Sequence, residues 1–262
     1  MSINDQFYAQ YPNGQRARGP AMKIAIVVVA AAVAALAVLV LSNISGTTKK
    51  PAALSPADSD TSALVIGAKA ASPQATRLAA AAVLKPTDLP GYASKPQTVD
   101  ASDAHIEHRL EACVGRPAPT FVARNKGLAF TKGDVKINSN ADIADSAASA
   151  GADLAALKDK GATCVRSELR SLLAGQGISV TSFTVAPVPL QISGSDGAVG
   201  FRLSVTATAA GHSATFTGYQ LDSLVGQAEI GISVFLSGPT SYPLTTAVSL
   251  LTKATQRARA AA

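Results

Sequence analysis

The pattern of apolar and polar positions separates one long apolar segment near the N-terminus from a region of periodic segments that follows it. Every residue from Ile24 to Leu41 is Ile, Val, Leu or Ala. As a helix this run is about 27 Å long, which matches the hydrocarbon core of a bilayer. Secretory signals usually have a shorter apolar region and a small-x-small cleavage site. We therefore expect residues 23–42 to be a retained transmembrane anchor, with a slowly cleaved long signal as the alternative.

The charges that flank this segment predict its orientation. Arg16, Arg18 and Lys23 precede it, whereas Lys49 and Lys50 follow it. This small excess of positive charge favours a cytoplasmic N-terminus. The chain is then a single-pass protein of the cell membrane, and its larger C-terminal part is extracytoplasmic.

Composition predicts how the rest of the chain is organised. Residues 1–22 contain hardly any aliphatic side chains, so we expect a disordered cytoplasmic tail. Residues 43–76 are mostly Ala, Ser, Thr, Pro, Lys and Asp, which is typical of a flexible linker. Residues 77–262 suit one extracytoplasmic domain with a single core.

Four segments of this domain have helical features. A short helix is expected from Arg77 to Leu84, where Pro86 stops it, and a second begins near Asp103. The longest lies within residues 144–177, and its apolar positions recur at helical spacing. The last follows Pro243 and is expected to cover the inner face of a sheet.

The remaining segments read as strands. Residues 120–143 alternate loosely around a turn at 131–134, which predicts two strands. After residue 177 the period is two, and turns at 194–197 and 211–212 divide this half into four strands of an antiparallel meander. In the last of these strands, residues 228–236, apolar residues alternate with mostly polar ones, which predicts a half-buried strand. The expected fold class is α+β, with helices packed on a mostly antiparallel sheet.

Charge and motifs narrow the function. The net charge of +6 is divided between the membrane flanks and a weakly basic domain, so it indicates no nucleic-acid partner. The sequence has no GxSxG, GxxxxGK(S/T), GxGxxG or HExxH motif, so neither catalytic residues nor a cofactor is expected. Asp222 interrupts an apolar strand, for which an edge position or a bulge is the favoured explanation over a pocket.

One cluster could hold a metal. On a helix, His105 and His108 share a face that Glu111 continues, and two imidazoles with a carboxylate can bind a divalent transition metal. A solvated helix surface is the favoured interpretation of the same residues.

The two cysteines are expected to form a disulfide. Cys113 and Cys164 lie in the part predicted to be extracytoplasmic, where oxidation is permitted. Two buried free cysteines are the alternative. A zinc site is disfavoured because neither cysteine has a nearby ligand pair.

Three short motifs carry a resemblance to a known class of domain. They are LKPTDLPGY at residues 84–92, LEACVG at 110–115 and ATCVRSELRSLL at 162–173. With the anchor, the linker and the strand-rich C-terminal half, the chain resembles the extracytoplasmic sensor-type domains of actinobacterial membrane proteins and lipoproteins, including those of mycobacterial serine/threonine kinases. The resemblance implies binding of small ligands or envelope components and no catalytic residue.

We therefore expect a non-enzymatic binding or sensor-like domain for a small or lipid-like envelope ligand or a protein partner, attached to the membrane through residues 24–41. The alternatives are an envelope hydrolase or metal-dependent enzyme that uses residues 105–111, and a structural interaction protein of an envelope assembly.

Overall fold

The computed structural model describes residues 72–97, 109–110, 112–115, 121–175, 178–209, 212–237 and 241–262. The expected tail, the anchor at residues 23–42 and most of the expected linker lie outside these ranges. Among the described residues, no helix is long and apolar enough to cross a membrane.

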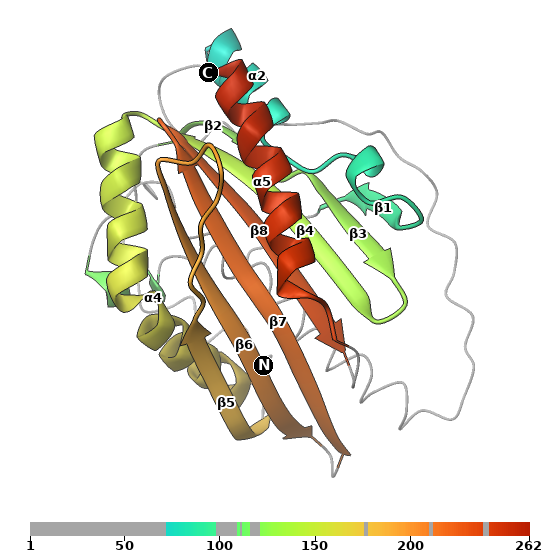
Figure 1. Ribbon diagram of the computed structural model, residues 1–262. Coiled ribbons are helices and arrows are strands. Elements are labelled where there is room, and N and C mark those ends of the chain that lie inside the picture. The colour runs from blue at the N-terminus through green and yellow to red at the C-terminus, as the bar shows by residue number, and fades with distance from the viewer. Residues whose placement is uncertain are drawn as a thin grey trace, which may run out of the picture.

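The described residues form an eight-stranded sheet with helices on both faces (Figure 1). The strand order is β1-β3-β4-β8-β7-β6-β5, and β2 also pairs with β4. All the pairings are antiparallel, as the sequence predicts for an α+β domain. The strands are β1 (Ala93–Pro96), β2 (Phe121–Asn125), β3 (Leu128–Lys132), β4 (Val135–Ala144), β5 (Ser179–Pro187), β6 (Gly197–Ala209), β7 (His212–Val225) and β8 (Ala228–Ser237).

The C-terminal meander is confirmed. Strands β5, β6, β7 and β8 are neighbours in chain order, and each pairs antiparallel with the next. The β7–β8 turn contains Gly226 at φ 57°, a left-handed conformation that glycine adopts without steric cost.

The prediction of two strands in residues 120–143 is wrong, because the first of them is broken. Gly127 has φ 59°, and the Asn125 side chain accepts a hydrogen bond from its N–H at 2.8 Å. This local turn divides the segment into β2 and β3, which pair with different parts of β4. The turn at 131–134 is confirmed as the β3–β4 hairpin.

The helices differ from expectation mainly at their ends. Helix α2 (Pro73–Ala81) begins four residues earlier than predicted, because the Ser72 hydroxyl accepts a hydrogen bond from the Ala75 N–H at 3.1 Å and Pro73 suits the first turn. A short 3-10 helix, η3 (Pro86–Asp88), follows it. Helices α4 (Ala147–Gly175) and α5 (Leu244–Ala261) lie where long helices were predicted.

Helices α2 and α5 cover one face of the sheet, which is apolar. Figure 1 shows α5 across β7, β8 and β4. Ile230, Ile232 and Val234 of β8 are fully buried in one cluster with Leu250 and Leu251 of α5. The final helix therefore covers the sheet as predicted.

Polar groups on this apolar face have partners. The Ser139 hydroxyl accepts a hydrogen bond from the Leu84 N–H at 3.0 Å, and the Ser223 and Thr255 hydroxyls are 2.7 Å apart. Arg257 of α5 donates to the carbonyl groups of Ala81, the last residue of α2, and Val83, and to both oxygens of Asp88. These polar groups on the α5 face therefore have hydrogen-bond partners, although the face is mostly apolar.

Helix α4 packs on the opposite face, mainly over β5 and β6. The helix approaches the sheet closely at Gly161, where a Cβ atom would lie 2.9 Å from the ring of Phe201. At Gly197 of β6 a Cβ atom would lie 2.9 Å from Leu154 of α4. Because these glycines have no Cβ atoms, the helix can pack closely against β6, in the apolar part of this face.

Candidate ligand-binding site

The face of the sheet that α4 shares carries a cluster of polar side chains where it passes from β6 to β7, β8 and β4. Strand register places them in rows, because residues directly opposite one another point to the same face. One row runs Asn138, Ser233, Gln220; the next runs Asn140, Gly231, Asp222; the third runs Asp142, Glu229, Leu224. We call the polar members the polar floor: Asn138, Asn140, Asp142, Gln220, Asp222, Glu229 and Ser233.

This arrangement contradicts the prediction that β8 is half-buried. Glu229 is 6% exposed and Ser233 is 4% exposed, so the polar side of the strand is buried like its apolar side. Period-two alternation shows that the two faces differ in polarity, but it cannot show whether the polar face meets water or protein.

The polar floor contains acceptor atoms without partners. Within the described ranges, Asn138 Oδ1, Gln220 Oε1, Asp222 Oδ2 and Glu229 Oε1 are buried and make no hydrogen bond. Gln220 Nε2 donates to Asp222 Oδ1 at 2.8 Å, which turns the amide toward the carboxylate and leaves one acceptor on each group. Buried polar groups nearly always have partners, so four such atoms on one surface require an explanation.

Burial also raises the pKa values of two carboxyl groups. Desolvation holds the pKa of Asp222 well above its ordinary value of 3.8; the hydrogen bond from Gln220 opposes this shift, and the charge of Asp153 adds to it. Desolvation likewise raises the pKa of Glu229 well above 4.5, and Asp153, Asp142 and Asp222 raise it further, while Arg124 opposes them.

One acid of the polar floor has a strong cationic partner. Arg124 of β2 contacts both carboxylate oxygens of Asp142, at 2.8 and 3.1 Å, in a bidentate pair. Its guanidinium also lies 4.6 Å from the centre of the Phe121 ring. Asp153, which lies near the start of α4, is 8% exposed. The site therefore combines four buried acids with a guanidinium that is already engaged.

Metal binding is not what this geometry favours. Among the described residues, no group of three or more His, Cys, Asp or Glu side chains could hold a metal ion. Asp222 and Glu229 are diagonal neighbours on adjacent strands, a relation that separates residues by about 7–8 Å. A ligand with two separated donor groups can therefore contact both acids at once.

The predicted metal ligands His105, His108 and Glu111 all lie outside the described residues. The structure instead brings Asp222 together with Asn138, Gln220 and Glu229, which the sequence did not group with it. Asp222 pairs in regular register with Val199 and Gly231, so the expected edge or bulge is wrong. A carboxylate in the middle of an apolar strand was the signal that could have identified the site.

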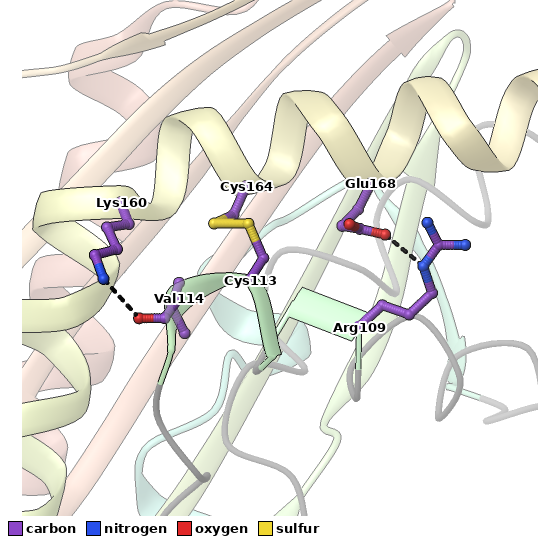
Figure 2. Close-up of a disulfide and its surroundings, with 6 residues drawn as sticks. All are labelled: Arg109, Cys113, Val114, Lys160, Cys164 and Glu168. Carbon is purple, nitrogen blue, oxygen red and sulfur yellow. Dashed lines mark hydrogen bonds and ion pairs between the residues drawn. A yellow bond between two sulfur atoms is a disulfide. The ribbon is translucent and has the colours of Figure 1, made fainter.

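The predicted disulfide is confirmed. Cys113 is bonded to Cys164 of α4, and the Cα atoms are 5.7 Å apart (Figure 2). Lys160 Nζ donates to the Val114 carbonyl at 3.2 Å on one side of the bridge. On the other side, Arg109 and Glu168 form an ion pair at 2.5 Å. The bridge therefore fixes the segment around Cys113 to the helix that packs beside the polar floor.

Comparison with known proteins identifies no family. No protein-family model and no curated protein matches the chain. The extracellular domain of PknH from Mycobacterium tuberculosis is similar at 12% identity and a TM-score of 0.40, over 70% of this chain and 95% of that chain. An uncharacterised protein from Mycobacterium smegmatis, the Rv0999 ortholog, is similar at 12% identity and a TM-score of 0.36, over 70% and 96%.

Proposed function

We propose that this chain is a membrane-anchored, non-enzymatic binding protein whose extracytoplasmic domain takes a small or lipid-like envelope ligand at the polar floor. The observation that carries the proposal is the set of buried acceptor atoms without partners. Each such atom costs about 1–3 kcal/mol of folding free energy unless something satisfies it. A ligand with hydrogen-bond donors would recover that free energy on binding.

The surroundings of the polar floor support a preformed site. Its side chains stand on the neighbouring central strands β7, β8 and β4, which are more rigid supports than loops. Gly231 lies between Asn140 and Asp222 in the register, so no side chain rises from the sheet at that position. The disulfide supports an oxidising compartment.

Native mass spectrometry of the full chain in mild detergent tests this function. Protein purified from membranes is compared with two variants of equal charge change, Asp222→Asn in the polar floor and Asp159→Asn on the exposed surface of α4. The expected result is a bound molecule in the wild type and in Asp159→Asn that is lost or strongly depleted in Asp222→Asn.

Two results contradict the proposal. If the wild-type chain carries no molecule and acquires none from a membrane extract, the binding function is wrong. If the adduct is equally abundant in Asp222→Asn, the ligand binds elsewhere. Chemical conversion of the adduct during incubation would instead show an enzyme.

A further inference from the structure

We infer that the polar floor selects organic cations with several N–H donors, of the class of primary amines and guanidinium compounds; this inference rests on the proposed binding function. Nothing else in the described part of the chain gathers so many buried polar groups on one surface.

The chemistry of the unsatisfied atoms points to donors. The four atoms are two amide oxygens, on Asn138 and Gln220, and two carboxylate oxygens, on Asp222 and Glu229. All four accept hydrogen bonds. A ligand that offered more acceptors, such as a phosphate or a carboxylate, would leave these atoms unsatisfied and add repulsion.

Charge points to a cation. Asp142, Asp153, Asp222 and Glu229 are all buried. Arg124, the cation that attracts Glu229, already binds both oxygens of Asp142. The charged group that acts on Asp222 is another acid, Asp153. An added positive charge would therefore relieve repulsion between acids, and a neutral donor would not.

Spacing points to an organic ligand with separated donors. The acceptors occupy neighbouring rows of the sheet: Gln220 and Asn138 in one, Asp222 in the next and Glu229 in the third. Residues in successive rows on one face are about 6–7 Å apart along a strand. An ammonium group with its substituents, or a planar guanidinium, can reach two rows at once.

Protonation is the rival explanation. If Asp222 and Glu229 are neutral at pH 7, their own O–H groups donate and no ligand is needed. The two explanations differ in what added amines do, because a protonated floor offers a cation no charge.

Isothermal titration calorimetry of the full chain at pH 7 separates them. The probes are spermidine, agmatine, tetramethylammonium and acetate, which vary the charge and the N–H donors independently. Spermidine and agmatine are expected to bind, and tetramethylammonium at least about tenfold more weakly because it has no N–H. Acetate is expected to give no heat.

Variants place the binding. Asp222→Asn and Glu229→Gln are each expected to weaken agmatine binding at least about tenfold, whereas Asp159→Asn, an exposed acid of the same helix that carries Asp153, is expected to leave it unchanged.

Each other outcome overturns the inference. Equal binding of tetramethylammonium would show that charge acts without donors, and equal agmatine binding by all variants would place the amine elsewhere. If no amine binds but the purified chain carries another molecule that Asp222→Asn loses, the ligand class is wrong and the binding function stands. If no amine binds and no adduct exists, the floor is protonated and both proposals fail.

Discussion

Strand β8 contributes alternate residues to two buried surfaces that differ in polarity and in hydrogen bonding. Ile230 and Ile232 point toward α5, where the packing is apolar and the polar groups have partners. Glu229 and Ser233, their neighbours in sequence, point to the α4 face, where acids and amides are equally buried but only partly hydrogen-bonded. Both sets of residues are buried, but burial stabilises the fold only for the apolar residues, not for the polar floor.

This difference indicates a division of labour within one sheet. An unsatisfied buried polar group is a net cost that folding alone does not select for. The α5 face is large and apolar enough to stabilise the domain while the opposite face carries that cost. Stability measurements on variants of the two faces can therefore test this difference.

The largest effect is expected on the α5 face. Ile232→Ala removes a side chain that is 0% exposed and leaves a cavity between β8 and α5. We expect a loss of about 4 kcal/mol in the free energy of unfolding, measured by urea denaturation followed by circular dichroism. Ile232→Val, the matched control, is expected to cost about 1 kcal/mol. Equal small losses in both variants would show that this face is loosely packed.

The second effect concerns the helix on the α4 face. Replacing Cys113 and Cys164 together by alanine opens a loop with a sequence separation of 51, and we expect a loss of about 3 kcal/mol. Hydrogen exchange is expected to show faster exchange in α4 while α5 keeps its protection, because the bridge is attached to α4. Uniformly faster exchange in both helices would contradict a separate role for the two faces.

The sequence predicted most of the fold because its strands and helices are local patterns. The meander, the hairpin at 131–134 and the long helix all follow from period and turn residues. The break at Gly127 was missed because it depends on a side-chain hydrogen bond from Asn125 and on close contact with Ser139, which lies on another strand. The start of α2 was missed because its cap, Ser72 followed by Pro73, lies in a segment whose Ala, Ser, Thr and Pro content is typical of a linker.

The site could not be predicted in the same way. Gln220, Asp222 and Glu229 are separated by ordinary strand sequence, and only the register places them beside Asn138 and Asp142. Their burial depends on what packs against the α4 face, which no local pattern records. The sequence offered His105, His108 and Glu111 as a candidate metal site, with a solvated helix surface as the favoured interpretation, because helical spacing is visible in the sequence and cross-strand proximity is not.

A third, smaller effect tests whether polar groups on the α5 face are satisfied. Arg257 donates to the Ala81 carbonyl at 3.1 Å, to the Val83 carbonyl at 2.9 Å and to Asp88 at 2.9 and 3.1 Å. Arg257→Ala is expected to cost about 2 kcal/mol by urea denaturation, because it removes all four of these hydrogen bonds and leaves Asp88 with the one from the Lys85 N–H. Arg257→Lys, which keeps the charge and loses the fork, is expected to recover part of the loss.

The pH dependence of the same variant checks the ion pair. Burial raises the pKa of Asp88, but hydrogen bonds from the Lys85 N–H and from Arg257 outweigh it and lower the pKa below 3.8. Because the pKa of Asp88 is lower in the folded state than in the unfolded state, its carboxylate stabilises the fold at pH values above the ordinary pKa. This stabilisation is lost as the pH falls below that pKa. The difference between wild type and Arg257→Ala is therefore expected to shrink in acid. A constant difference would mean that Arg257 acts through its carbonyl contacts alone.

The smallest effect has the opposite sign. Asp222→Asn keeps the size of the side chain and the oxygen that Gln220 binds, and it removes a buried carboxyl group. We expect this variant to be about 1 kcal/mol more stable than the wild type at pH 7, since a neutral group is easier to bury than a charged one. Asp159→Asn, which removes an exposed carboxylate, is expected to change stability little.

The pH dependence of the free energy of unfolding is expected to have opposite signs for carboxyl groups on the two faces. Because the pKa of Asp222 is raised in the folded state, the unfolded chain releases this proton first once pH passes 3.8. The folded state then binds more protons, so the free energy of unfolding falls as pH rises toward the raised pKa, opposite to the slope from Asp88. The raised pKa of Glu229 adds a second decrease in the free energy of unfolding, which begins near pH 4.5. Asp222→Asn is expected to make this fall shallower in urea denaturation measured from about pH 4 to pH 7. If the variant were instead destabilised at pH 7, the Asp222 carboxyl would have to be satisfied within the fold, and the two faces would obey the same rule.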